Sequence, residues 1–244
     1  MFPVDIDAEE MTFTRTFTKG NNGDDTGWET IVLPFYCHEV YVGDINEENR
    51  IDWFHSKSEN GRKFWLYKYI GGSEGEINFG YEDSKDVTTQ DWFLNRDEPY
   101  IIAVPGNKWG DYYDLSNKPI TFRATHTNWA SVKANSSLEK KAGFYMLKGT
   151  YCNANLTDVY VLNSRGDFFE KEESVIVNPF NAYFTGETST TSKLNISFDA
   201  VPTAIIAVDN IQYDNVKIFD LQGRRVQNAQ KGIYIQNGKK VVIK

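Results

Sequence analysis

The chain has 244 residues, of which 40% are hydrophobic and 15% aromatic, and its formal charge at pH 7 is −8. This composition excludes a disordered polypeptide and allows a substantial hydrophobic core. The sequence contains no run of eighteen apolar residues, so we expect no membrane span. Because the chain is acidic and repels phosphates, we also expect no nucleic-acid partner.

The N-terminal part of the chain reads as β-structure without a visible secretory signal. Residues 1–11 are acidic and lack the basic start and apolar stretch of a signal peptide. Residues 12–18, T-F-T-R-T-F-T, place threonines on one strand face and Phe13, Arg15 and Phe17 on the other. Similar runs occur at 29–36, 63–70, 99–104, 119–124, 143–151, 158–163, 174–185 and 193–198. The alternation predicts an all-β fold, either a sandwich or a distorted barrel.

We expect residues 1–200 to form the main β domain. Two weak internal similarities within it indicate two related β units. T-I-V-L-P-F-Y at 30–36 resembles V-I-V-N-P-F-N-A-Y-F at 175–184, and residues 12–16 resemble 120–125. The possible units are about 10–105 and 120–200. Gly71-Gly72 predicts a turn. The best helix candidate, 128–141, is equally compatible with a loop.

The sequence predicts neither a metal site nor a cofactor. Three histidines lie far apart without ligand spacing, and residues 21–27 carry oxygen-rich side chains suited to Ca²⁺ but fit a plain hairpin loop better. Cys37 and Cys152 are expected to be reduced and buried, with one disulfide as the alternative. Catalytic motifs of the serine-nucleophile or phosphate-loop type are absent.

The segment 106–114, G-N-K-W-G-D-Y-Y-D, is the best candidate for a ligand site. Its glycines suit a turn, and aromatic rings in such a loop can stack on the apolar face of a sugar while amides and carboxylates bond its hydroxyls. The alternative is that these rings belong to the core. The candidate ligand-binding residues are Trp109, Tyr112, Tyr113, Asn107, Asp111 and Asp114.

The last residues form a separate basic segment. Residues 216–244 carry seven Lys or Arg and one Asp, which is +6, so the other 215 residues carry −14. V-K-I-F-D-L-Q-G-R-R-V, G-I-Y-I and G-K-K-V-V-I-K predict three short strands, with a tight turn at Asn237-Gly238. The expected domain is 201–244, a linker followed by a β module. Residues expected to pack this module on the body are Ile218, Leu221, Ile233, Ile235, Val241 and Ile243.

This tail resembles the type IX-like C-terminal sorting module of exported and surface proteins of Bacteroidetes, although an ordinary terminal β-hairpin is the alternative. The resemblance implies an extracellular or cell-surface location. With the missing catalytic motifs, it favours a non-enzymatic β protein that binds a glycan or a surface protein. The alternatives are a glycan-active hydrolase that uses an Asp/Glu pair, and a structural C-terminal domain of a larger surface protein.

Overall fold

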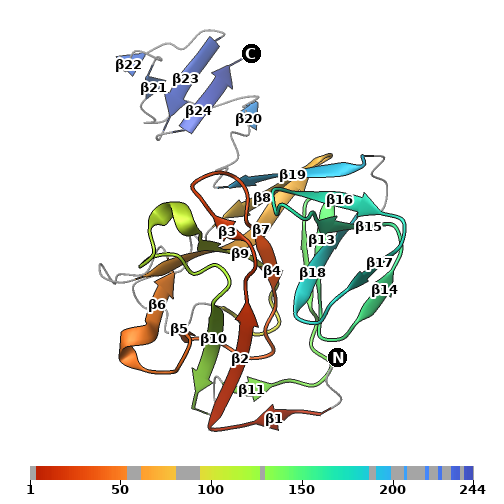
Figure 1. Ribbon diagram of the computed structural model, residues 1–244. Helices are drawn as coiled ribbons and strands as arrows, with labels where there is room; N and C mark the ends of the chain where they lie inside the picture. Colours follow the sequence, from red (N-terminus) through yellow and green to blue (C-terminus); the bar gives the residue numbers. More distant parts are fainter. Residues whose placement is uncertain are drawn as a thin grey trace. The chain divides into compact units, whose positions relative to one another are not determined.

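The computed structural model divides the chain into two compact units, Met1–Asp199 and Ala200–Lys244, called here the body and the tail. The described residues are 4–53, 62–80, 94–126, 130–186, 191–198, 206–207, 218–219, 225–226, 232–236 and 239–243. Strands dominate both units (Figure 1), and the helical residues among those described form two 3-10 turns, η1 (Glu47–Asn49) and η2 (Asn107–Trp109). The predicted all-β fold is therefore confirmed.

The described residues of the body form nineteen strands. The first ten are β1 Ile6–Asp7, β2 Glu10–Thr16, β3 Gly20–Asn21, β4 Glu29–Ile31, β5 Glu39–Val42, β6 Arg50–Trp53, β7 Lys63–Ser73, β8 Glu76–Gly80, β9 Tyr100–Pro105 and β10 Pro119–Thr125. The others are β11 Ser131–Val132, β12 Glu139–Ala142, β13 Tyr145–Thr150, β14 Ala154–Leu156, β15 Val159–Leu162, β16 Phe168–Glu172, β17 Val175–Val177, β18 Asn181–Thr185 and β19 Lys193–Phe198.

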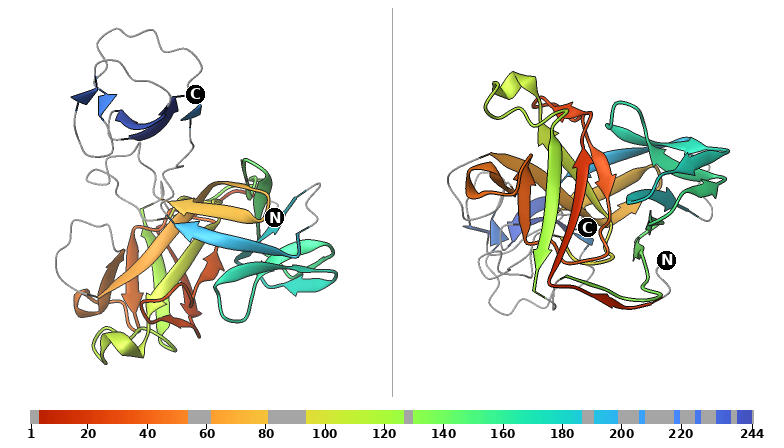
Figure 2. Two further views of the ribbon diagram at one scale, coloured as in Figure 1. Left: turned by 90° about the horizontal axis from the view of Figure 1, so that it is seen from above. Right: turned by 60° about the horizontal axis from the view of Figure 1, so that its bottom comes forward.

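Fifteen of these strands form one mixed sheet in the order β12-β13-β18-β15-β16-β19-β8-β7-β6-β5-β10-β2, with β9 joined to β7, β4 and β3. The strand path does not close into a barrel, so the sandwich-like alternative holds. Parallel pairing of β19 with β8 connects the C-terminal strands to the N-terminal ones, and Figure 2 shows these two strands side by side. The pairs β1-β11 and β14-β17 are separate two-stranded sheets.

Strand β9 separates two hydrophobic cores. All six of its residues are buried, which explains why Y-I-I-A-V reads as a continuous apolar run and not as an alternation. Tyr100, Ile102 and Val104 face the first core, whereas Ile101 and Ala103 face the second. The period-two geometry of a strand makes this division possible.

Each core is filled by large side chains from several strands. The first core includes Phe17, Leu33, Ile51, Phe64, Leu66, Ile120 and Phe122. The second includes Tyr69, Phe79, Leu147, Tyr160, Phe169, Phe184 and Leu194. Edge-to-face ring pairs recur in the second core, such as Phe169 with Phe184 at a centroid distance of 4.9 Å.

The predicted turn at Gly71-Gly72 is wrong, because both glycines lie inside β7. The register of β7 against β8 shifts between Tyr69 and Gly71, which marks a β-bulge. Gly71 has φ +146°, and a Cβ on Gly72 would lie 2.3 Å from the carbonyl oxygen of Glu76. The glycines therefore allow the strand to bend and do not end it.

The two sequence similarities correspond to neighbouring segments. Phe13 of β2 pairs directly with Phe122 of β10, so the two strands repeat a pattern that serves one core. Likewise, the N–H of Val32 donates to the carbonyl of Phe180 at 3.1 Å. The helix candidate 128–141 contains β11 and the start of β12 among its described residues, so it does not form a helix there.

The tail contains a five-stranded sheet in the order β20-β24-β23-β21-β22. Its strands are β20 Ile206–Ala207, β21 Ile218–Phe219, β22 Arg225–Val226, β23 Gly232–Gln236 and β24 Lys239–Ile243. Gln236 pairs with Lys239 across β23 and β24, the register of a two-residue hairpin connection. Asn237, Gly238 and Leu221 lie outside the described residues, and so do the tail side chains expected to pack on the body.

Candidate functional site

The aromatic loop between β9 and β10 presents its rings to solvent. Trp109 ends η2 and is 45% exposed, whereas Tyr112 and Tyr113 follow it and are 64% and 49% exposed. The tyrosine rings meet edge-to-face at 5.0 Å between centroids. Three large rings are thus exposed within five positions, and Trp109, Tyr112 and Tyr113 are called here the aromatic platform.

A second loop, which follows β3, holds the platform in place. The indole Nε1 of Trp109 donates to the carbonyl of Asn21 at 3.0 Å, and the N–H of Lys108 donates to Asn22 Oδ1 at 3.0 Å. A Cβ at Gly106 would lie 2.6 Å from Asn22 Oδ1, so a larger residue there would displace the side chain that accepts from Lys108. Trp109 is therefore fixed by its edge while part of its surface stays exposed.

Strand β7 supports the platform from another side. The ring of Trp65 lies 5.8 Å from that of Trp109, and the guanidinium of Arg62 lies 5.6 Å from the centre of the Tyr112 ring. The second contact has the geometry of a cation–π interaction. Trp65 of β7 and Arg62, the residue just before β7, thus extend the platform beyond the segment 106–114.

The polar residues of the segment divide into two kinds. Asn107 and Asp111 are exposed beside the rings. Asp114 is half-buried, and its Oδ1 accepts hydrogen bonds from the N–H of Ser116 at 2.9 Å and from its hydroxyl at 2.6 Å. Asp114 therefore shapes the turn into β10, a role that its position in the sequence did not reveal.

The loop at 21–27 is not the hairpin that the sequence indicated. β3 pairs parallel with β9 and β4 pairs antiparallel with it, so both flanking strands use β9 as partner. The side-chain amide of Asn21 donates to the carbonyls of Asp24 and Thr26, each at 2.7 Å. These internal bonds occupy oxygens that a cation would need, and the described residues contain no cluster suited to a metal ion.

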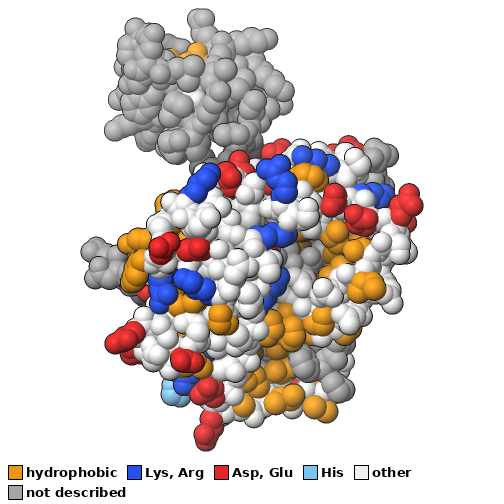
Figure 3. Space-filling model, in the orientation of Figure 1, with side chains coloured by type: hydrophobic (Ala, Val, Ile, Leu, Met, Phe, Trp, Pro, Cys, Tyr) orange, Lys and Arg blue, Asp and Glu red, His pale blue; other side chains and the backbone are white. Residues whose placement is uncertain are grey.

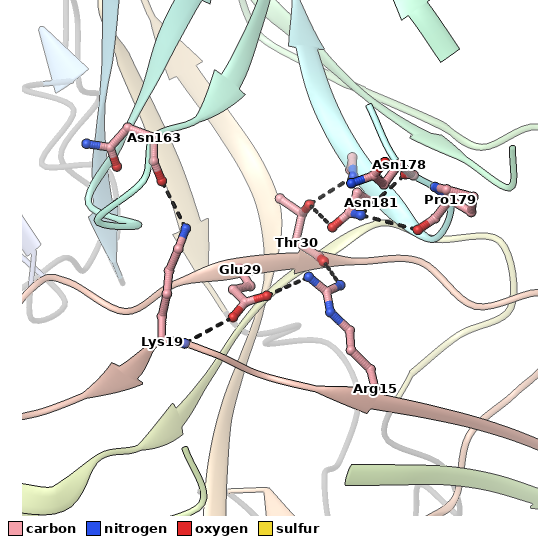
Figure 4. A network of polar contacts seen from close by, with 9 residues as sticks. Arg15, Lys19, Glu29, Thr30, Asn163, Asn178, Pro179 and Asn181 are labelled. Atoms are coloured by element: carbon pink, nitrogen blue, oxygen red, sulfur yellow. Dashed lines mark hydrogen bonds and ion pairs between the residues drawn. The ribbon is translucent and has the colours of Figure 1, made fainter. Parts of the chain in front are cut away.

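A second feature of the body is a cleft of about 300 Å³ lined by residues of β2, β4, β15, β17 and β18 and of the segments next to them. Figure 4 shows its polar wall, where Arg15 and Lys19 extend from the region of β2 toward Glu29 and Asn163. The remaining lining residues are Thr30, Val161, Leu162, Val175, Ile176, Val177, Asn178, Asn181 and Ala182.

Ion pairing organises the charged side of this cleft. Arg15 Nη2 lies 2.5 Å from Glu29 Oε2, and Arg15 Nη1 donates to the carbonyl of Thr30 at 2.8 Å. Lys19 Nζ donates to the carbonyl of Asn163 at 3.0 Å. Burial lowers the pKa of Lys19, while the nearby Glu29 acts in the opposite direction. Sequence reasoning missed this cleft, because Arg15 and Val175 come from distant strands.

The two cysteines are both free, but they are not both buried. Cys37 is fully buried, whereas Cys152 is exposed, which corrects the expectation of two buried thiols. Cys152 follows β13 in the turn before β14, outside both cores. Its strand-like sequence context therefore gave a misleading indication of burial.

Comparison with known proteins assigns this fold to no family. No protein-family model matches the chain, and neither a curated protein nor a solved structure shows significant similarity to it. Among the described residues, no helix has the length and apolar character required to cross a membrane. The site geometry therefore carries the functional interpretation.

Proposed function

We propose that the chain is an exported or cell-surface protein without catalytic activity that binds a glycan through the aromatic platform. The observation that carries this proposal is the exposure of Trp109, Tyr112 and Tyr113 on a loop anchored by Asn21 and Asn22. Sugars present C–H faces that stack on such rings, and a fixed loop reduces the entropy lost on binding.

The exposed polar residues beside the rings would form hydrogen bonds with the hydroxyl groups of the glycan. Asn107 supplies an amide with both a donor and an acceptor, and Asp111 supplies a carboxylate. Asp114 contributes indirectly, because its bonds to Ser116 set the course of the loop. A protein ligand is the second possibility, since aromatic residues with an arginine nearby also suit a protein interface.

A glycan-array screen of the purified chain, followed by titration of the best glycan, tests the proposal. Tyr112→Ala is the sharpest variant, because this ring is 64% exposed. We expect it to weaken binding about tenfold or more while changing stability by less than about 0.5 kcal/mol. Trp109→Phe retains a ring but loses the bond to Asn21, and we expect a smaller loss of affinity.

Phe144→Ala provides a control, because Phe144 is an aromatic residue as exposed as Trp109 (45% each) that lies outside the platform. This variant should bind like the original chain. Equal affinity of all three variants for the glycan, or failure of the chain to bind any glycan on the array, would contradict the proposal. Binding of a protein but of no glycan, with the same loss in Tyr112→Ala, would support the second possibility.

A further inference from the structure

The cleft beside Arg15 is built into the body by a local separation of two strands. β15 and β18 are bridged at Tyr160 and Phe184, and beyond that bridge Leu162 and Ala182 both line the cleft. The N–H of Ala182 donates at 2.9 Å to Thr30 Oγ1, a side chain from β4. Because β4 supplies this bond, the sheet remains open without leaving the amide of Ala182 unsatisfied.

One wall of the cleft is aliphatic. It is formed by Val161, Leu162, Val175, Ile176, Val177 and Ala182. Ile176 is 63% exposed at the rim, the second highest exposure among the large hydrophobic residues described. Figure 3 shows hydrophobic side chains gathered over β14 and β17, with basic side chains toward the middle of the body. An apolar group that entered the cleft would therefore contact branched side chains.

The opposite wall carries one net positive charge, from Arg15 and Lys19 against Glu29. Both oxygens of Glu29 have partners, since Oε2 pairs with Arg15 at 2.5 Å and Oε1 accepts from the N–H of Lys19 at 3.4 Å. The Lys19 ammonium has three hydrogens, and its bond to Asn163 engages one of them. The wall therefore retains donor capacity next to a positive charge, which suits an anionic oxygen.

We propose that this cleft binds a carboxylate that carries a branched aliphatic group. The carboxylate would accept hydrogen bonds from Lys19 and Arg15, and the aliphatic group would contact the wall around Ile176. The volume of about 300 Å³ lies at the small end of ligand pockets and fits a leucine-sized group. Two sources share this chemistry, namely a free short-chain acid and the C-terminal residue of a peptide. The proposal is independent of glycan binding, because no lining residue belongs to 106–114.

Titration by NMR and calorimetry tests the chemistry. The probes are N-acetyl-leucine and its amide, 4-methylpentanoate, and the peptide acetyl-Gly-Gly-Leu with a free or an amidated C-terminus. We expect each carboxylate to bind at least about tenfold more tightly than its amide, because the amide loses a charged hydrogen bond. Tighter binding of the peptide than of 4-methylpentanoate indicates a peptide C-terminus, and the reverse order indicates a free acid.

Variants then locate the site. Lys19→Gln keeps the pair of Arg15 with Glu29 and should weaken carboxylate binding about tenfold or more. Lys133→Gln is the control, because Lys133 is a 43% exposed lysine that pairs with Asp5 away from the cleft. If Lys19→Gln lowers the melting temperature, Ile176→Ser at the exposed rim serves as the second test of the site. We expect it to weaken carboxylate binding by the same factor. Equal binding of acid and amide, full binding by both variants, or no binding of any probe would overturn the proposal.

Discussion

The two cysteines have opposite surroundings, which leads to a prediction at the scale of single residues. Burial raises the pKa of Cys37 to about 12, because a thiolate there would lose its hydration. Cys152 is exposed. We therefore expect a thiol reagent at pH 8 to modify one equivalent per native chain, at Cys152, and a second equivalent after denaturation. Two equivalents in the native chain would contradict the burial of Cys37, and Cys152→Ser should remove the native reaction.

Glu98 provides a prediction about pH. Burial opposes its ionisation, but Asn95, Lys68, Tyr100 and Lys140 together outweigh burial and lower its pKa from the usual 4.5. A carboxylate with a lowered native pKa stabilises the fold fully above the unfolded value, and this contribution is lost as pH falls through the native value. The free energy of unfolding should therefore decrease as the pH is lowered below about 5, in part because Glu98 becomes protonated.

The variant Glu98→Gln tests this assignment. At pH 7 it should lower the free energy of unfolding by about 1–2 kcal/mol, because the carboxylate accepts from Asn95 at 2.6 Å and from Tyr100 at 2.9 Å. Urea titrations at pH 7 and pH 3 should show a smaller loss of stability on acidification than in the original chain. Glu47→Gln, at an exposed position in η1, is the control. An unchanged pH dependence in Glu98→Gln would contradict the assignment.

At the scale of the elements, two glycines in tight turns allow the stability cost of backbone strain to be measured apart from the cost of a steric contact. Gly166, between β15 and β16, has φ +67°, and a Cβ there would lie 2.2 Å from the carbonyl oxygen of Trp28. Gly43, after β5, has φ +75° and open space around it. Gly43→Ala should cost about 1 kcal/mol, the strain of the left-handed region. Gly166→Ala should cost about 3 kcal/mol or more, because the backbone at Trp28 must also shift.

Thermal or urea unfolding of the two glycine variants measures the difference directly. Both substitutions add the same methyl group at similar φ, so the excess cost of Gly166→Ala reports the contact with Trp28. Similar costs for both variants would mean that the turn after β15 relaxes freely. The turn connects the β15–β16 hairpin to the start of β4, since the N–H of Trp28 donates to the carbonyl of Gly166 at 3.1 Å.

At the scale of the whole molecule, the described residues of both hydrophobic cores lie in the body. A fragment of residues 1–199 should therefore fold cooperatively by itself. The fragment ends before β20, because β20 pairs with β24 and therefore belongs to the tail. Calorimetry of the fragment and the full chain also tests the packing expected from the tail sequence. A lower melting temperature of the fragment supports that packing, and equal values contradict it.

Local sequence patterns predicted the all-β class of fold and ten of the nineteen strands described in the body. Alternation of polar and apolar residues has a local cause, because adjacent side chains of a strand point to opposite faces. It identified β2 through the alternation of threonines with Phe13 and Arg15, and β7 through the run K-F-W-L-Y-K-Y. The same local reasoning located the aromatic segment, since its turn composition and its rings lie within nine residues.

The folded structure fixes the features that depend on segments distant in the chain. It placed Gly71 and Gly72 in a bulge against β8, and it exposed Cys152. It also brought Arg15 within reach of β17 and set Asn21 under Trp109. Burial and pairing between strands arise from long-range packing, which a single segment does not encode. For this reason the sequence predicted an aromatic site, whereas the cleft emerged from the fold.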